Sequence, residues 1–152
     1  MHLSISDIQI EPCDKDSISV ILDGLNTYNL NKVPAVIEKI WTPIELQVIN
    51  AKKEVVGGLL SGIGYWGGLE IKILWVHEDY RSLGIGSQLM DKAEQNAVQK
   101  GATIAILDTF DFQAKDFYLK KGYDIIGQLD NFPEGHQRIF FSKKLIEIVD
   151  ND

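Results

Sequence analysis

The stretch that decides the fold is LWVHEDYRSLGIGS, from Leu74 to Ser87. Its apolar start predicts the end of a strand, and the polar residues 77–83 predict a loop. Gly84 and Gly86 lie where the apolar spacing of the following residues predicts a long helix. The first N–H groups of a helix lack acceptors within the helix, and its dipole is positive there. Because glycine lets an anion approach these groups and Arg81 adds a cation, the stretch predicts an anion-binding loop.

Other uses of a glycine-rich loop fit this stretch less well. A nucleotide P-loop needs Lys and then Ser or Thr after its last glycine, whereas Gly86 is followed by Ser87 and Gln88. A dinucleotide-binding loop needs a third glycine where Leu89 stands, although Asp108 follows a strand at a plausible distance. A purely structural role, in which the glycines only permit a tight helix start, stays open.

Hydrophobic spacing on both sides of the loop predicts a mixed α/β fold. Asp14 and Asp16 are candidate N-caps of a first helix that runs through Tyr28. The remaining expected helices cover residues 35–40, 84–100 and 113–121, and the expected strands cover residues 3–11, 44–48, 55–66, 69–76, 103–107, 123–129 and 138–145. Since no repeat or linker interrupts this order, we expect one domain over residues 1–152.

Composition narrows the class of protein. The 152 residues include 15 Lys and Arg against 22 Asp and Glu, a net charge of −7, which argues against a nucleic-acid partner. Cys13 is the single cysteine, so an internal disulfide is excluded and a reducing compartment is expected. The uncharged stretch Val55 to Leu69 is too short and too rich in glycine to span a membrane. We therefore expect a cytoplasmic protein, and no histidine pair has the spacing of a metal site.

Two sequence blocks carry a family resemblance. The first is Arg81-Ser82-Leu83-Gly84-Ile85-Gly86, preceded by Leu74-Trp75-Val76, which resembles the acyl-CoA signature of the GNAT superfamily of N-acyltransferases. The second is Gln113-Ala114-x-x-Phe117-Tyr118-x-x-x-Gly122-Tyr123, which resembles a helix and strand of the same superfamily. One expected helix and one expected strand separate the blocks, as in that superfamily. The resemblance extends over residues 54–145 and covers the first 50 residues only in the order of elements.

The resemblance implies a fold and a cofactor. The fold would be a single-domain α/β (α+β) GNAT-type fold, with a mixed, mostly antiparallel central sheet of about six or seven strands, splayed in the middle and flanked by about four helices. Acetyl-CoA would be the acyl donor, with its diphosphate on the loop amides and its pantetheine arm beside the strand before the loop. The residues expected to bind it are Leu74, Trp75, Val76, Arg81, Ser82, Leu83, Gly84, Ile85, Gly86, Ser87, Gln113 and Phe117.

The resemblance also implies catalytic roles. Tyr118 matches the general acid of the superfamily, and a phenol with a pKa of about 10 is suited to protonating a leaving thiolate. Glu70, on the strand before the loop, matches an acidic general base found in several such enzymes. Asp108, at the end of the next strand, is the other candidate base, and either acid could instead be a solvated strand-end carboxylate. Lys72 would point the same way as Glu70 by strand alternation and could pair with it.

These expectations combine into a function. The chain would transfer acetyl from acetyl-CoA to a primary amine by direct attack in a ternary complex, because no cysteine lies near either block to carry the acyl group. The excess of acidic residues suits a cationic small-molecule or peptide acceptor, and a homodimer is left open. The alternative is a non-catalytic acyl-CoA-binding sensor or scaffold module. The two differ at Tyr118, because only an enzyme needs its hydroxyl group.

Overall fold

The computed structural model describes residues 3–146, and the chain divides into two compact units, residues 1–35 and 36–152. The main element of the first unit is α1, Lys15–Lys32, whose N-cap is Asp14. Oδ1 of Asp14 accepts hydrogen bonds from the backbone N–H and the hydroxyl of Ser17, each at 2.8 Å. Two donors at the helix start are satisfied in this way. The expected helix and one of its two candidate caps are confirmed.

The expected strand over residues 3–11 is wrong. Ile5–Asp7 forms a single 3₁₀ turn, η1, and no strand lies between residues 3 and 35. Ser4 caps the turn, since its hydroxyl accepts from the N–H of Ser6 while a carboxylate oxygen of Asp7 accepts from the N–H of Ser4 at 3.1 Å. Short polar side chains that bind the nearby backbone compete with sheet pairing. The irregularity at Asp7 in the alternating pattern is therefore a turn.

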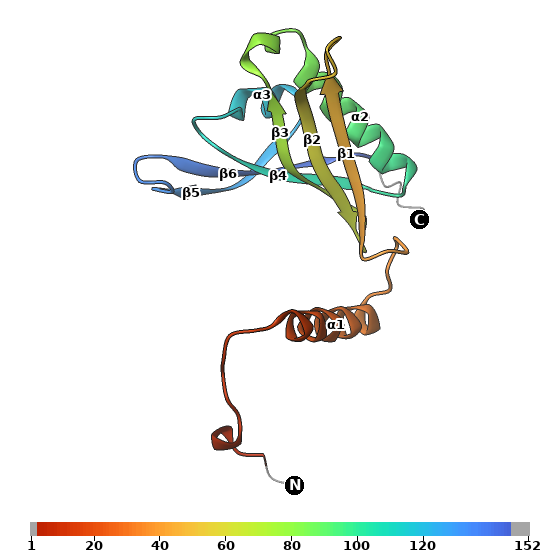
Figure 1. The fold of residues 1–152 in the computed structure, drawn as a ribbon, viewed down its shortest axis with the longest axis vertical. Coiled ribbons are helices and arrows are strands. Elements are labelled where there is room, and N and C mark those ends of the chain that lie inside the picture. Colours follow the sequence, from red (N-terminus) through yellow and green to blue (C-terminus); the bar gives the residue numbers. More distant parts are fainter. Residues whose placement is uncertain (1–2, 147–152) are drawn as a thin grey trace, which may run out of the picture. The chain divides into compact units, whose positions relative to one another are not determined.

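The second unit is built on a six-stranded sheet (Figure 1). Its strands are β1 Trp41–Ile49, β2 Val55–Gly64, β3 Gly68–Val76, β4 Ile104–Phe110, β5 Asp124–Asp130 and β6 Gln137–Lys144, in the spatial order β1-β2-β3-β4-β6-β5. Every neighbouring pair is antiparallel except β3 and β4, which are parallel. The expected mixed, mostly antiparallel sheet is confirmed, with six strands.

The sheet opens in its middle. Pairing between β3 and β4 joins only Gly68–Glu70 to Ile104–Ile106, so beyond Glu70 this edge of β3 pairs with no strand of the part of the chain that the structure describes. In the same strand a β-bulge adds Lys72, because Leu60 pairs with Ile73 while Ser61 pairs with Ile71. A bulge changes which residues face the core. Leu69 and Ile71 are buried before it, and the even-numbered residues after it point to the same side. The expected splaying is confirmed.

The expected short helix over residues 35–40 is wrong. The N–H groups of Val36 and Ile37 both donate to the carbonyl oxygen of Tyr65, each at 2.9 Å, instead of to carbonyls of their own segment. Tyr65 directly follows β2, so this segment is held by a turn distant from it in sequence. Burial of Ile37 in the core stabilises the same path. A tertiary contact has therefore overridden a local helical spacing.

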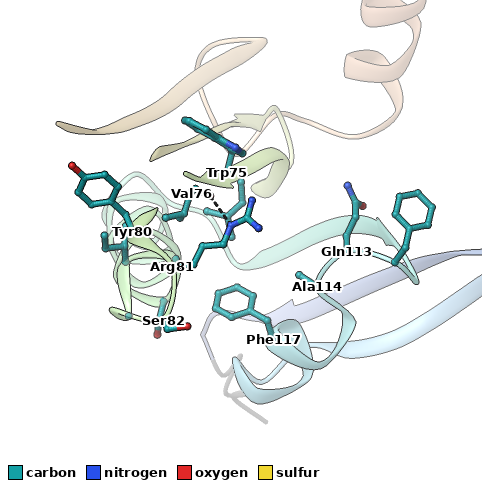
Figure 2. A pocket seen from close by; sticks show the side chains of 14 residues that line it. Trp75, Val76, Tyr80, Arg81, Ser82, Gln113, Ala114 and Phe117 are labelled. Atoms are coloured by element: carbon teal, nitrogen blue, oxygen red, sulfur yellow. Dashed lines mark hydrogen bonds between the residues drawn. The ribbon is translucent and has the colours of Figure 1, made fainter. Parts of the chain in front are cut away.

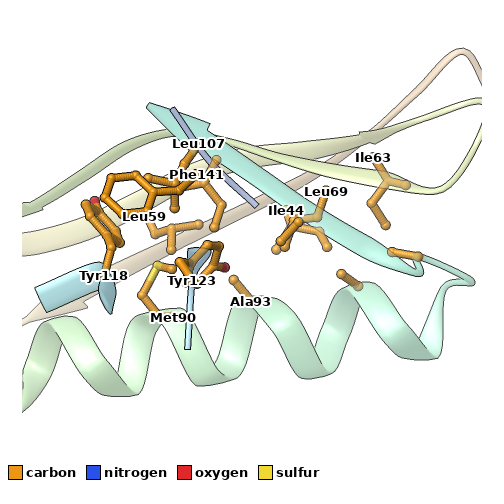
Figure 3. Packing of buried hydrophobic residues seen from close by; sticks show 14 of the residues in the cluster. Ile44, Leu59, Ile63, Leu69, Met90, Ala93, Leu107, Tyr118, Tyr123 and Phe141 are labelled. Carbon is orange, nitrogen blue, oxygen red and sulfur yellow. The ribbon is translucent and has the colours of Figure 1, made fainter. Parts of the chain in front are cut away.

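Two helices complete the second unit. α2, Ile85–Gln99, packs against β1, β2 and β3, and its apolar stripe includes Met90, Ala93 and Ala97. Figure 3 shows Met90 and Ala93 facing Leu59, Ile44 and other residues of the sheet. α3, Lys115–Lys120, follows β4. The described residues thus hold three α-helices, one fewer than expected. The largest fully buried side chains are Tyr123, Phe141, Leu59, Ile63, Leu69, Met90 and Ile139.

Candidate active site

A cavity of about 750 Å³ lies where β3 ends, beside the start of α2 and the segment that leads into α3 (Figure 2). Its walls combine apolar side chains with the polar glycine loop. The lining residues are Leu74, Trp75, Val76, Tyr80, Arg81, Ser82, Gly84, Ile85, Gly86, Ser87, Phe112, Gln113, Ala114 and Phe117. The two sequence blocks, about thirty residues apart, therefore form one site. Sheet topology brings them together, because β3 and β4 are neighbours and each block follows one of them.

The loop before α2 has the geometry of an anion site. Ser82 and Gly84 have positive φ angles of 66° and 79°, and Gly84 is the N-cap of the helix. The first helical hydrogen bond runs from the N–H of Gln88 to the carbonyl of Gly84. The N–H groups of Ile85 to Ser87 therefore precede the first helical bond and remain available. Turns with left-handed residues direct successive N–H groups toward one point, which favours bound anions.

Arg81 joins the loop to the end of β3. Its Nε donates to the carbonyl oxygen of Val76 at 2.9 Å, across five residues of sequence. This hydrogen bond fixes the Nε end of the guanidinium, and Figure 2 shows the guanidinium of Arg81 in the middle of the cavity. The terminal nitrogens of a guanidinium are donors only. A fixed positive charge therefore lies in the same cavity as the free N–H groups of the helix.

The open edge of β3 forms a second wall of the site. Leu74, Trp75 and Val76 pair with β2 on one side, while on the other side β4 has already diverged. Backbone groups on the unpaired edge of a strand are available to another extended chain. The cavity thus offers an electropositive end and an adjacent strand edge, which suits an elongated ligand with an anionic head.

Gln113 is oriented by two donors. Its Oε1 accepts from the backbone N–H of Phe110 at 2.8 Å and from the hydroxyl of Thr109 at 2.9 Å. A backbone N–H can only donate, so the oxygen of the amide must face it. The Nε2 group is consequently the free end of the side chain, and Gln113 lines the cavity. The sequence predicts a cofactor contact here, and the group of Gln113 that is free to make it is a hydrogen-bond donor.

Tyr118 lies beside the cavity rather than in its wall. Its ring packs against Phe117, Tyr123 and Phe141, with centroids 5.2, 6.1 and 5.8 Å away. The residue is only 7% exposed, yet its hydroxyl has no hydrogen-bond partner among residues 3–146. In that part of the chain every fully buried side-chain oxygen has a partner, so the hydroxyl of Tyr118 is not fully buried. The oxygen therefore retains some exposure to solvent. Burial raises the pKa of the phenol, and the negative charge of Asp108 raises it further.

Glu70 projects from β3 on the side opposite the buried Leu69 and Ile71. Lys72 follows it, and the ammonium lies 3.5 Å from Oε2 of Glu70, so the expected pairing is confirmed. The ammonium also lies 5.9 Å from the centroid of the Trp41 ring. That ring lies on the backbone of Gly62, where a Cβ atom would overlap it. Glu70 does not line the cavity described above, and among residues 3–146 its carboxylate is bound only by this loose pair.

Asp108, the other candidate base, is bound more tightly. Its Oδ1 accepts from Nε of Arg138 at 2.9 Å and from a terminal nitrogen at 2.8 Å. The hydrogen bond to Asp108 and its negative charge raise the pKa of Arg138. The guanidinium also lies over the rings of Phe110, Phe132 and Phe140. A carboxylate held by two nitrogens of one guanidinium is less free to turn toward an acceptor amine than a loosely paired one.

With this geometry established, we compared the chain with known proteins. The family model described as "Acetyltransferase (GNAT) family" matches residues 24–123, which is most of the chain. The chain belongs to this family. The match begins inside the first unit and continues into the second, where it ends at Tyr123, before β5. Membership supports acyltransferase activity and the binding of coenzyme A.

Individual GNAT proteins resemble the chain over different lengths. Blasticidin-S acetyltransferase from Streptomyces morookaense is 33% identical over 97 residues, which cover 61% of this chain and 71% of that protein. The crystal structure of an acetyltransferase from Bacillus cereus has a TM-score of 0.83 at 31% identity and covers 92% of this chain and 99% of its own. A structure of aminoglycoside 6′-N-acetyltransferase complexed with coenzyme A has a TM-score of 0.63 at 23% identity, covers 71% and 76%, and shares the fold.

The cavity contains every residue expected to bind the cofactor except Leu83. The side chain of Leu83 is 66% exposed and is not part of the cavity wall. Three lining residues were not anticipated: Tyr80, Phe112 and Ala114. Ala114 belongs to the second sequence block, whereas Tyr80 ends a single 3₁₀ turn, η2 (Glu78–Tyr80), and Phe112 lies in the turn after β4. Phe112 stacks on Phe110, two residues before it, with ring centroids 5.2 Å apart.

Within residues 3–146, no helix is both long enough and apolar enough to cross a membrane. The same residues hold no group of three or more His, Cys, Asp or Glu side chains arranged to hold a metal ion.

The two loop glycines give a matched pair of variants. Gly86 lacks a positive φ, and a Cβ there would lie 3.6 Å from Phe117, an ordinary contact. We expect Gly86→Ala to fold and even gain about 0.5–1 kcal/mol of helix stability, but to bind CoA about tenfold more weakly because the methyl group narrows the anion site. Gly84→Ala, with its φ of 79°, should instead lose about 1 kcal/mol. Thermal melts would measure the change in stability of each variant, and calorimetry would measure its affinity for CoA. Equal CoA affinity in Gly86→Ala and wild type would contradict the expected narrowing of the anion site.

Proposed function

We propose that the chain transfers an acetyl group from acetyl-CoA to a primary amine by direct attack within a ternary complex. The observation that carries this proposal is the single cavity that combines free helix N–H groups, Arg81 and the open edge of β3. That combination fits a ligand with a diphosphate at one end and an amide-containing arm along a strand. The family membership supports the same donor.

The residues of the chain take separate roles in the proposed reaction. The N–H groups from Ile85 to Ser87 and the guanidinium of Arg81 hold the diphosphate, and Gln113 donates to the arm. When bound, acetyl-CoA supplies the thioester that the amine attacks. A backbone N–H near Leu74 or Trp75 polarises the thioester carbonyl. These assignments place the reacting carbon in the opening between β3 and β4.

Two protons move in the proposed reaction. The acceptor enters as an ammonium ion, and Glu70 accepts a proton from it so that the nitrogen lone pair can form the new C–N bond. As the C–S bond breaks, Tyr118 donates its phenolic proton to the sulfur, and the second proton that the nitrogen loses restores the phenol. The products are an amide, the free thiol of coenzyme A and one proton on Glu70, which passes to solvent. Cys13, the single cysteine, lies outside both sequence blocks, which supports direct transfer over a covalent acyl-enzyme.

The acceptor is proposed to be a cationic small molecule or peptide. The net charge of −7 favours the approach of cations, and Glu70 would receive the ammonium. One relative is named for blasticidin-S. We further propose that residues 1–152 act as one catalytic domain, since the family match crosses from one unit to the other.

Two measurements test the proposed function. Isothermal titration calorimetry with CoA should show binding to the full chain, and release of free thiol from acetyl-CoA should depend on an added amine from a panel of small-molecule and peptide amines. No heat with CoA would overturn the whole proposal. Binding without amine-dependent thiol release across the panel would favour the sensor or scaffold module instead.

The orientation of the Gln113 amide predicts how a substitution there changes the KM for the acyl donor, acetyl-CoA. Gln113→Glu keeps an oxygen for Phe110 and Thr109 but replaces the free Nε2 donor with an acceptor. We therefore expect the KM for acetyl-CoA to rise about tenfold with little change in the melting temperature. Gln95→Glu, an exposed residue of α2 outside the cavity, is the control for the added charge. An unchanged KM in Gln113→Glu would show that the amide nitrogen makes no contact with the donor.

A further inference from the structure

Lys121 links α3 to the first turn of α2. Its ammonium donates to the hydroxyl oxygen of Ser87 at 2.8 Å and to Oδ1 of Asp91 at 2.6 Å. The side chain is only 15% exposed, although lysine usually extends into solvent. The bond to Ser87 spans 34 residues of sequence, and no motif suggested it. The contact reaches the wall of the cavity, because Ser87 lines it and Lys121 lies behind it.

A second contact of α3 supports the same loop. Phe117 lies four residues before Lys121, so the two side chains share one face of the short helix. The ring of Phe117 faces Gly86, because a Cβ on that glycine would lie 3.6 Å from it. Phe117 of α3 and Lys121, the C-cap residue of that helix, therefore contact two successive residues at the start of α2, through a ring at Gly86 and through an ammonium at Ser87.

The chemistry of the Lys121–Ser87 pair fixes the direction of the serine hydroxyl. An ammonium has three N–H donors and no acceptor, so Ser87 must be the acceptor in this bond. The hydrogen of the hydroxyl is then left to donate elsewhere. Within residues 3–146, Ser87 has no other side-chain hydrogen bond. Its oxygen lies in the cavity wall beside the free N–H groups of α2, where an anion would accept that hydrogen.

We propose that Lys121 is a positioning residue of the coenzyme site, which acts through Ser87 to present a hydroxyl donor to the diphosphate. Asp91 holds the ammonium from the other side and is itself half exposed, so the lysine keeps a fixed place beside the loop. The inference rests on the proposed function, since it concerns the same donor. It adds a residue that acts on the anion site from outside the cavity wall.

Calorimetry with CoA tests the proposal directly on the full chain. We expect Lys121→Met to weaken CoA binding about tenfold, because a hydroxyl oriented by a cation is replaced by a freely rotating one. Lys120→Met is the matched control, since it removes the same charge from an exposed neighbour in α3. Lys121→Arg should recover part of the affinity. If wild type fails to bind CoA, the proposed function falls; if Lys121→Met binds as wild type does, only this inference falls.

Two further measurements separate positioning from a general packing role. Ser87→Ala should weaken CoA binding by a similar factor. The double variant Lys121→Met with Ser87→Ala should bind CoA little more weakly than either single variant. Additive losses would overturn the action through Ser87. The affinity loss should persist for dephospho-CoA, which keeps the diphosphate. The kcat/KM for S-acetylpantetheine, which has no phosphate, should be unchanged in Lys121→Met, and an equal loss there would show that α3 had simply moved.

Discussion

Replacing Tyr118 with phenylalanine should lower kcat for acetyl transfer by about a hundredfold or more, since general acids typically contribute that much. The ring should stay in place, because Phe117, Tyr123 and Phe141 contact its faces and edges and phenylalanine keeps them. No hydrogen bond to the described residues is lost, as the hydroxyl makes none. Affinity for CoA and the melting temperature should therefore change little.

The pH dependence of the wild-type enzyme offers a check on this role. Burial, reinforced by the charge of Asp108, raises the pKa of Tyr118 above that of a free phenol. The phenol therefore keeps its proton at every pH below about 10, and loss of the acid should not reduce kcat within that range. A Tyr118→Phe variant with wild-type kcat would contradict the general-acid role and favour the sensor module.

Replacing Glu70 with glutamine should lower kcat about a hundredfold at neutral pH. An alkylamine with a pKa near 10 is about one part in a thousand unprotonated at pH 7, so removal of its proton limits the reaction. The defect in kcat should shrink as the pH approaches 10, because a large fraction of the acceptor amine is then already unprotonated and needs no base. This convergence of variant and wild type with rising pH is specific to loss of a base. It would be measured with one amine acceptor between pH 7 and 10.

The neighbouring residues provide the controls. Lys72→Met removes the ion pair at 3.5 Å but leaves the carboxylate, so kcat should stay within about twofold of wild type. Asp108→Asn tests the other acid, which Arg138 holds by two nitrogens. A pH-dependent kcat defect in Asp108→Asn, together with normal activity in Glu70→Gln, would transfer the base role to Asp108.

Regular elements were predictable where local patterns and tertiary contacts agree. The helix now seen as α2 has its apolar stripe on the sheet and ends before Gly101, whose φ of 102° suits glycine. β3 and the glycine loop likewise follow from the stretch that begins at Leu74. In such segments the hydrophobic face, the cap and the turn residue all favour one conformation, so one sequence is sufficient.

The errors lie where local spacing competes with other contacts. The segment 35–40 has helical spacing, but the carbonyl of Tyr65 takes its N–H groups. The segment 3–11 alternates like a strand, but Ser4 and Asp7 close a turn on each other. The bulge at Lys72 is also invisible locally, because it exists only relative to the partner strand.

The sequence alone determined the chemistry of the glycine loop, because helix N-termini and glycines act through their own backbone. It also determined the family, through two blocks of residues. Only the tertiary structure decided that the blocks share one cavity, that Gln113 presents a donor, that Arg138 holds Asp108 and that Lys121 reaches Ser87. Each of these contacts joins residues that lie 3 to 34 positions apart in the sequence. Which atom donates in a hydrogen bond is fixed only when both partners are known.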